Sequence, residues 1–92
     1  MKRYQPNPEV LASKLPNETV LFHMGNDRLY QLNGTATRVW DLLSSGCGTD
    51  EIRDRMSAEF EIDSEQLARE IESLLLSLDA EGLVVAGEGA AA

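Results

Sequence analysis

The chain has 92 residues, of which 42% are hydrophobic and 5% aromatic, so it can build one modest and mainly aliphatic core. Its net charge of −8 is concentrated in residues 50–81, which carry three arginines and eleven acidic residues. A negative field of this kind repels phosphate and argues against duplex nucleic acid as a partner.

Cysteine content and hydropathy narrow the class of protein further. The single cysteine, Cys47, excludes an internal disulfide and a metal site built from several cysteines. No apolar run approaches the roughly 18 residues of a membrane span, and no apolar segment follows the N-terminus. We therefore expect a cytoplasmic protein with no membrane partner, folded as one domain over residues 1–86. Residues 87–92 are small and featureless and are expected to form a flexible tail.

The N-terminal third has the pattern of a small antiparallel sheet. Pro6 and Pro8 keep the first residues extended and exclude a helix there. Turn residues at 16–17 and 25–27 separate three short runs, the second of which is β-branched and apolar as in a central strand. Residues 9–32 are therefore predicted as a three-stranded meander, with strands at 10–15, 19–24 and 28–32.

The next segment is predicted as an amphipathic helix. Its apolar residues recur at i, i+3, i+4 and i+7 and lie on one face: Ala36, Val39, Trp40 and Leu43. Asn33 can cap the first turn, and Gly46 suits a left-handed exit. Trp40 is expected in the core, with stacking on a ligand as the alternative.

Two further helices follow. Thr49 is predicted to cap the second helix, whose inner face carries Ile52 and Met56. Asp63 is predicted to cap the third, with a hydrophobic staple between Ile62 and Leu67. The third helix ends at Glu81-Gly82, a short strand follows at 83–85, and its buried stripe is expected to be Leu67, Ile71, Leu74 and Leu78. The fold class is α+β and winged helix-turn-helix-like, with the meander followed by three helices.

Candidate chemistry is sparse. Cys47 and His23 could form a nucleophile–base pair, but we expect His23 to sit among apolar strand residues and Cys47 to be an exposed loop thiol. The acidic residues lack the order of a calcium loop, and Gly46 and Gly48 lack the lysine of a phosphate loop. Ser64 could carry the prosthetic arm of an acyl-carrier-like protein, although a serine just inside a capped helix is ordinary. We expect no metal, no cofactor and no enzymatic activity.

An ordered set of motifs covers nearly the whole chain. It consists of Tyr30-Gln-Leu-Asn33, Trp40–Leu43, Gly46, an acid-led helix at 49–55, a joint at 60–63, and a leucine-rich helix at 71–78 followed by Gly82–Val84. The set resembles the PqqD family of peptide chaperones, which hold the leader of a ribosomally made precursor peptide while other enzymes modify it. His23 and Ala36 depart from the residues common in the family. The early Tyr-x-Pro and the compact chain look more like the lasso-peptide type.

The resemblance implies where a leader peptide binds. In such proteins the leader adds as a strand beside the segment equivalent to 28–32 and lies in a cleft against the third helix. That segment ends the meander and carries neither proline nor lysine, so its edge is unguarded. The expected peptide-binding residues are Leu29, Tyr30, Gln31 and Leu32 for main-chain pairing, and Leu67, Glu70, Ile71, Leu74 and Leu75 for side-chain pockets.

The resemblance also implies partners. These are the precursor leader peptide and a modifying enzyme, such as a leader protease, a cyclase or a radical enzyme. Leu76 points away from the buried stripe and could contact a partner or simply be exposed. The alternative function is a winged-helix transcription regulator, but its recognition helix, residues 64–81, would carry one arginine and five acidic residues into the major groove.

Overall fold

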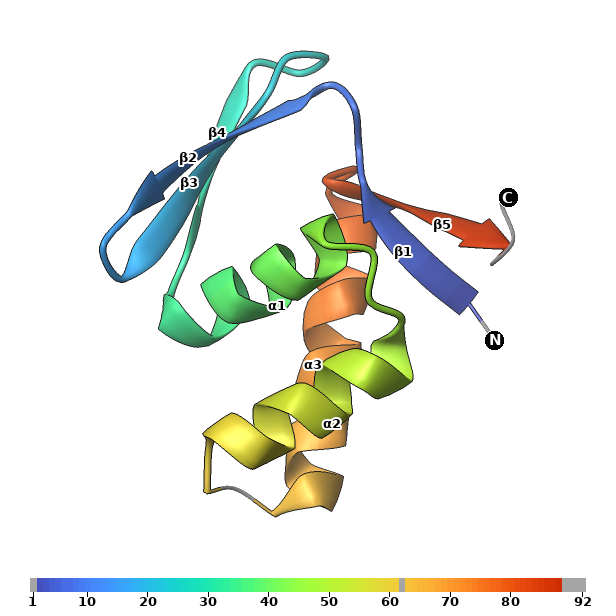
Figure 1. The fold of residues 1–92 in the computed structure, drawn as a ribbon. Helices are drawn as coiled ribbons and strands as arrows, with labels where there is room; N and C mark the ends of the chain where they lie inside the picture. The colour runs from blue at the N-terminus through green and yellow to red at the C-terminus, as the bar shows by residue number, and fades with distance from the viewer. Residues whose placement is uncertain (1, 62, 89–92) are drawn as a thin grey trace.

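The computed structural model describes residues 2–61 and 63–88. Along the chain the elements are β1 (Lys2–Pro6), β2 (Val10–Leu15), β3 (Glu18–His23), β4 (Arg28–Leu32), α1 (Gly34–Ser44), α2 (Thr49–Glu59), α3 (Ser64–Ala80) and β5 (Val84–Glu88) (Figure 1). The predicted Ile62 staple and residues 89–92 of the predicted tail lie outside the described residues. Among the helices described, none has the length and apolar character needed to cross a bilayer.

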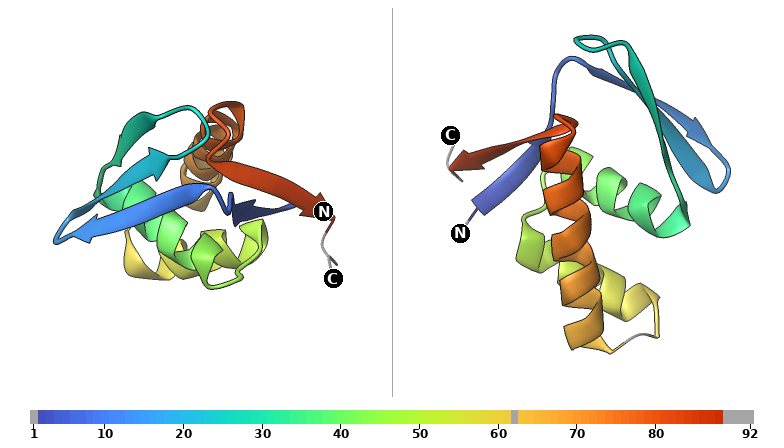
Figure 2. Two further views of the ribbon diagram at one scale, coloured as in Figure 1. Left: turned by 90° about the horizontal axis from the view of Figure 1, so that it is seen from above. Right: turned by 180° about the vertical axis from the view of Figure 1, so that it is seen from behind.

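The predicted meander is confirmed. Strands β2, β3 and β4 form an antiparallel sheet in that order, so β4 is an edge strand. In the central strand Thr19, Leu21 and His23 are buried, whereas the alternating residues are partly exposed. This alternation is the period-two pattern of a sheet with one face on the core. The helices lie on the side of the sheet to which these buried side chains point (Figures 1 and 2).

A second sheet was not predicted. Strand β1 pairs antiparallel with β5, from Lys2 opposite Glu88 to Pro6 opposite Val84. The expected strand at 83–85 is therefore part of a longer one, and residues 87 and 88 belong to β5, past the expected domain boundary at 86. Proline fits in β1 because β1 is an edge strand of this two-stranded sheet.

The core lies between the larger sheet and the helices. The predicted inner faces of α1 and α2 are buried, and Trp40 is a core residue. The stripe predicted for α3 was wrong at one position, because Leu75 is 2% exposed and Leu74 is only half-buried. Three consecutive leucines, 74 to 76, satisfy the helical spacing almost equally well, so periodicity alone could not choose among them.

The helix ends partly follow the prediction. The Asn33 side chain accepts a hydrogen bond of 2.9 Å from the Ala36 N–H, as expected for an N-cap. Gly46 has a φ of 94°, the left-handed exit predicted for α1. The other two caps were wrong in detail: Gly48 occupies the N-cap of α2 in place of Thr49, and Asp63 stands at the N-cap of α3 without a side-chain hydrogen bond.

Polar contacts fix the larger sheet against the end of α3. Asn7, between β1 and β2, donates from Nδ2 to the Gly82 carbonyl (2.8 Å), and its N–H donates to the Leu83 carbonyl (3.0 Å). The Tyr30 hydroxyl of β4 donates to Glu81 Oε1 (3.1 Å). The Tyr30 bond joins β4 directly to the C-terminal end of α3, and the two Asn7 bonds join the β1–β2 connection to the residues that follow α3 (Figure 2).

Candidate peptide-binding site

The main-chain groups of β3 fix the orientation of those in β4. The Met24 N–H donates to the Glu9 carbonyl (2.9 Å) on the β2 side, whereas the His23 carbonyl accepts from the Asp27 N–H (2.8 Å) on the β4 side. Successive residues of a strand direct their main-chain groups to opposite sides. Thr19, Leu21 and His23 therefore face β4, where their register partners are Leu32, Tyr30 and Arg28.

It follows that β4 exposes two residues along its open edge. Leu29 and Gln31 alternate with the residues that face β3, so their N–H and C=O groups point away from the sheet. An extended chain placed beside β4 would meet these donors and acceptors. Of the four residues predicted for main-chain pairing, only Leu29 and Gln31 thus have the required orientation.

The side chains of β4 divide between the two faces of the sheet. Tyr30 and Leu32 lie on the inner face, half-buried and buried, and Leu32 belongs to the core. Leu29 lies on the outer face and is 69% exposed, in a cross-strand row with Phe22 and Leu11. A strand added to this edge would likewise send alternate side chains inward, toward the helices, and outward.

A cleft opens where β4 passes into α1. Its volume is about 220 Å³, and it lies between the start of α1 and the N-terminal half of α3. Leu67 and Ile71 are buried and form its floor, half-buried Leu74 forms a wall, and exposed Glu70 stands at the rim. Four of the five residues predicted on α3 are therefore brought together here.

The α1 side of this cleft was missed by the sequence analysis. Asn33, Thr35, Ala36 and Val39 line it. The helical pattern predicts this apolar face as core and gives no indication of a cleft beside it. The small residues Thr35 and Ala36 in the first turn of α1 could have indicated this cleft, because they leave room beside α3.

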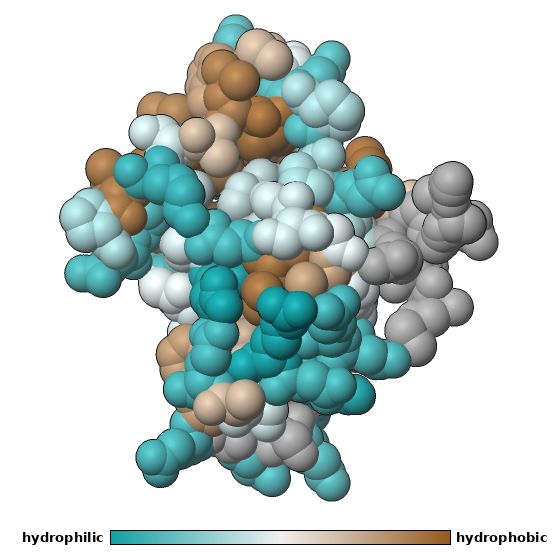
Figure 3. Space-filling view, viewed as in Figure 1, coloured by the Kyte–Doolittle hydropathy of each residue, from teal (hydrophilic) through white to brown (hydrophobic). Residues whose placement is uncertain are grey.

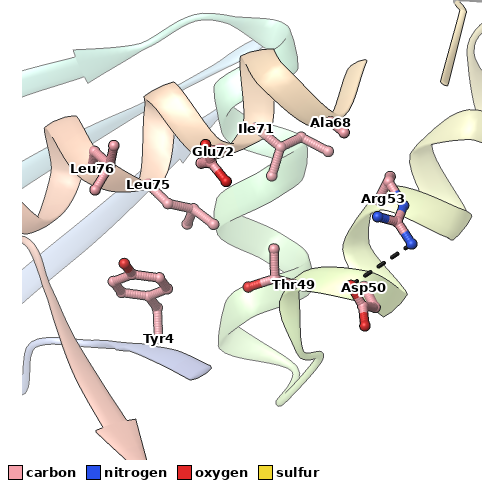
Figure 4. A pocket seen from close by; sticks show the side chains of 9 residues that line it. All are labelled: Tyr4, Thr49, Asp50, Arg53, Ala68, Ile71, Glu72, Leu75 and Leu76. Carbon is pink, nitrogen blue, oxygen red and sulfur yellow. Dashed lines mark ion pairs between the residues drawn. The ribbon is translucent and has the colours of Figure 1, made fainter. Parts of the chain in front are cut away.

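Leu75 does not belong to the cleft. Its side chain is buried and lines a different pocket, on the side of α3 that faces β1 and α2 (Figure 4). Consecutive helix residues point about 100° apart, so Leu74 and Leu75 open onto different surfaces. The expectation that Leu75 contributes to the same pocket as Leu74 is corrected accordingly.

One carboxylate, that of Glu70, stands at the rim of the cleft. Gln66 Nε2 donates to Glu70 Oε2 (3.0 Å), which fixes this carboxylate one turn along α3. The space-filling view shows a mainly hydrophilic surface over the lower, helical half of the molecule, and apolar side chains above it around the larger sheet (Figure 3). A basic residue of a bound peptide would find a carboxylate at this position.

An ion pair fixes α1 against α2. Arg38 donates to both carboxylate oxygens of Glu59, at 2.8 and 2.5 Å. This hydrogen bonding raises the pKa of Arg38 and lowers the pKa of Glu59 below its usual 4.5. The pair holds the helix that supplies one wall of the cleft.

The residues considered for catalysis have structural roles. Cys47 is 6% exposed and packs in the core, so its predicted exposure was wrong. His23 is buried, and its Nδ1 accepts a hydrogen bond of 3.0 Å from the Gly25 N–H. Among the described residues no cluster of three or more His, Cys, Asp or Glu side chains could hold a metal ion.

Comparison with known proteins places the chain in context. The sequence profile of the family described as coenzyme PQQ synthesis protein D (PqqD) matches residues 18–84. No curated protein sequence gives a significant match. Among solved structures, TbiB1 in complex with the TbiA(β) leader peptide is 26% identical, with a TM-score of 0.85 over 87% of this chain and 93% of that one.

Two further structures share the fold. A lasso peptide synthetase B1 complexed with its leader peptide is 23% identical, with a TM-score of 0.83 over 90% of this chain and 98% of that one. The heterocyclase TruD is 13% identical, with a TM-score of 0.67 over 95% of this chain and 12% of that one. The alternatives of a transcription regulator and an acyl carrier find no support in these matches. The profile match spans most of the residues that build the sheet, the cleft and α3, and the chain belongs to the PqqD family.

Proposed function

We propose that this protein is a non-catalytic chaperone that binds the leader of a ribosomally made precursor peptide. The leader adds as a strand to the open edge of β4 and places alternate side chains in the cleft between α1 and α3. One observation carries the proposal: the outward main-chain groups of Leu29 and Gln31 lie on a strand that ends at a cleft with apolar residues of α1 and α3 in its lining.

The chemistry of the two parts is complementary. Main-chain hydrogen bonds to β4 are independent of peptide sequence and supply affinity. The cleft selects among peptides, because Leu67, Ile71 and Leu74 accept an apolar side chain and Glu70 accepts a basic one. We expect an apolar residue of the leader in the cleft and a basic residue close to it in sequence.

Membership of the PqqD family and the leader-bound TbiB1 structure support this function. By the same likeness we propose that a modifying enzyme, such as a leader protease, a cyclase or a radical enzyme, receives the bound precursor from this protein in the cytoplasm. The lasso-peptide type is favoured because one of the two leader complexes is a lasso peptide synthetase B1, which matches over 90% of this chain.

Calorimetry tests the proposal directly. The ligand is a synthetic leader taken from a short precursor gene sought beside the gene for this protein, and the control is the same peptide with its residues scrambled. We expect micromolar or tighter affinity for the leader only. In amide NMR spectra, the leader should shift Leu29 and Gln31 of β4 and Leu74 of α3. Absence of both heat and shifts would reject leader binding; heat with shifts elsewhere would reject the site.

A further inference from the structure

A second pocket lies on another side of α3. It has a volume of about 370 Å³ and is enclosed by β1, α2 and α3. Leu75 and Leu76 of α3 and the ring of Tyr4 form an apolar end, and Thr49 of α2 stands opposite them (Figure 4). The volume is near the lower limit of about 300–1,000 Å³ for ligand pockets, which suits one or two side chains of a protein partner.

The exposure of Leu76 is the unusual feature of this pocket. Its side chain is 57% exposed although it adjoins the buried Leu75 and the half-buried Tyr4. One exposed leucine needs no explanation, but here it borders a concave apolar surface. An apolar side chain placed between Tyr4 and Leu76 would bury part of both.

The polar part of the pocket carries an excess of negative charge. The Glu72 side chain points from α3 into the pocket, and no cation pairs with it among the residues whose side chains are described (Figure 4). Arg53 lies 3.7 Å from Asp50 and 3.9 Å from Asp54, so two carboxylates already share its charge. A cation that enters the pocket is therefore attracted to Glu72 and Asp50.

The pocket is accessible while the leader cleft is occupied. The α3 residues of the cleft are Leu67, Glu70, Ile71 and Leu74, and those of the pocket include Ala68, Glu72 and Leu75. Each of these three follows a cleft residue by one position, a rotation of about 100° around the helix. Apart from Ile71, which touches both, the two surfaces share no residue, so both can be filled at once.

We infer that this pocket is a docking site for a protein segment that presents a bulky apolar side chain next to a lysine or arginine. The apolar side chain lies against Tyr4, Leu75 and Leu76, and the cation pairs with Glu72. The partner is a second protein that acts on the bound precursor. This identity of the partner rests on the proposed function, whereas the preference of the pocket for an apolar side chain and a cation does not.

Two small probes test the chemistry without a leader. Acetyl-Leu-Arg-amide and acetyl-Leu-Glu-amide are titrated into the ¹⁵N-labelled chain. We expect saturable shifts of the Thr49, Ala68 and Leu76 amides, with the arginine probe binding about 2- to 5-fold more tightly, the range for one exposed ion pair. Glu72→Gln should remove this preference, whereas the matched Glu70→Gln, in the leader cleft, should keep it. Equal affinity of the two probes, or shifts confined to the leader cleft, would overturn the inference.

A separate measurement identifies the occupant. Leu76→Lys places a positive charge at the exposed rim, where it removes the apolar contact, repels a cation and does not disturb the core. It should weaken binding of the arginine probe and leave leader affinity unchanged; loss of leader affinity in this variant would contradict the independence of the two surfaces. Failure of the parent chain to bind a leader would count against the proposed function alone, because the probe titrations contain no leader. Sedimentation velocity should show a monomer at all concentrations. A dimer of the parent chain that Leu76→Lys dissociates would show that a second copy fills the pocket, and the inference would be wrong.

Discussion

Thr19 carries a buried hydroxyl that finds no hydrogen-bond partner among the described residues. A buried polar group without a partner loses its hydration on folding and regains nothing. Thr19→Val replaces the hydroxyl by a methyl group of similar size, so we expect the free energy of unfolding to rise by about 1–2 kcal/mol. Urea unfolding followed by circular dichroism measures this change.

The neighbouring residue provides a control. Val20 lies on the outer, partly exposed face of β3, so Val20→Thr should change the unfolding free energy much less than Thr19→Val. If Thr19→Val destabilised the domain, its hydroxyl would have a partner in solution, such as bound water, and this account of Thr19 would fail.

The contact between Arg38 and Glu59 makes a specific prediction about pH. Hydrogen bonds from Arg38 lower the pKa of Glu59, so the folded state binds this proton less readily than the unfolded chain. The pair therefore stabilises the fold fully above the unfolded pKa near 4.5, and this contribution disappears as the pH falls through the lower folded value. Glu59→Gln should reduce the free energy of unfolding at pH 7 and reduce it less at pH 3.

Unfolding curves of Glu59→Gln at both pH values measure this dependence. The effect should be small, because the side chains of Arg38 and Glu59 are both partly exposed. Glu51→Gln is a suitable comparison, because Glu51 pairs with Arg55 inside α2 and joins no second helix. An equal loss for Glu59→Gln at both pH values would show that the ion pair is not the cause.

At the scale of the elements, a proline scan of β4 tests strand addition. Proline removes one main-chain donor. At Gln31 that donor faces the open edge, so Gln31→Pro should keep the domain folded and weaken leader binding by about 1–2 kcal/mol. At Tyr30 it faces β3, so Tyr30→Pro should clearly lower the melting temperature. Calorimetry with the leader and thermal unfolding by circular dichroism separate the two effects.

Leu29→Pro extends the same test, since Leu29 has the orientation of Gln31. Gln31→Ala is the matched control, because it removes the side chain and keeps the N–H donor. Were the folded proline variants to bind the leader as tightly as the parent, the peptide would not be adding to this edge.

The elements that could be predicted are those with local signals. The β2–β4 meander follows from turn residues and alternation, and α1 follows from its cap, stripe and glycine exit. The β1–β5 pair could not be predicted, because the two strands lie at opposite ends of the chain and no turn or other local sequence signal indicates that they pair. Cys47 was misplaced for a related reason: a loop between glycines suggests exposure, whereas the turn after α1 directs this side chain into the core.

The candidate site likewise has one part that could be predicted from the sequence and one part that could not. The resemblance to PqqD proteins pointed to the edge strand and the third helix, and main-chain orientation then reduced four candidate residues to Leu29 and Gln31. The wall from α1 and the distinction between Leu74 and Leu75 depend on how the helices cross. Helix crossing is a tertiary property that periodicity in a single helix does not contain.

At the scale of the whole molecule, charge predicts the salt dependence of leader binding. Residues 50–81 carry most of the net charge of −8, and Glu70 stands beside the cleft. A leader that is neutral or basic where it passes α3 should bind less tightly as salt rises. The effect should be modest, because exposed ion pairs contribute only about 0–1 kcal/mol each.

Calorimetry between low and high sodium chloride measures this effect, and Glu70→Gln should reduce the slope. Binding that tightens with salt would contradict an electrostatic attraction and leave the apolar cleft as the main source of specificity.

The pairing of β1 with β5 has a consequence for how such a domain can be joined to other proteins. Lys2 and Glu88 lie opposite each other in one ladder, away from the open edge of β4 (Figure 1). The polypeptide thus enters and leaves the fold at a single point, as domains that tolerate insertion into a host loop generally do. If the domain were inserted into a loop of an unrelated enzyme, the two ends of that loop would stay close together, and the open edge of β4 would remain exposed.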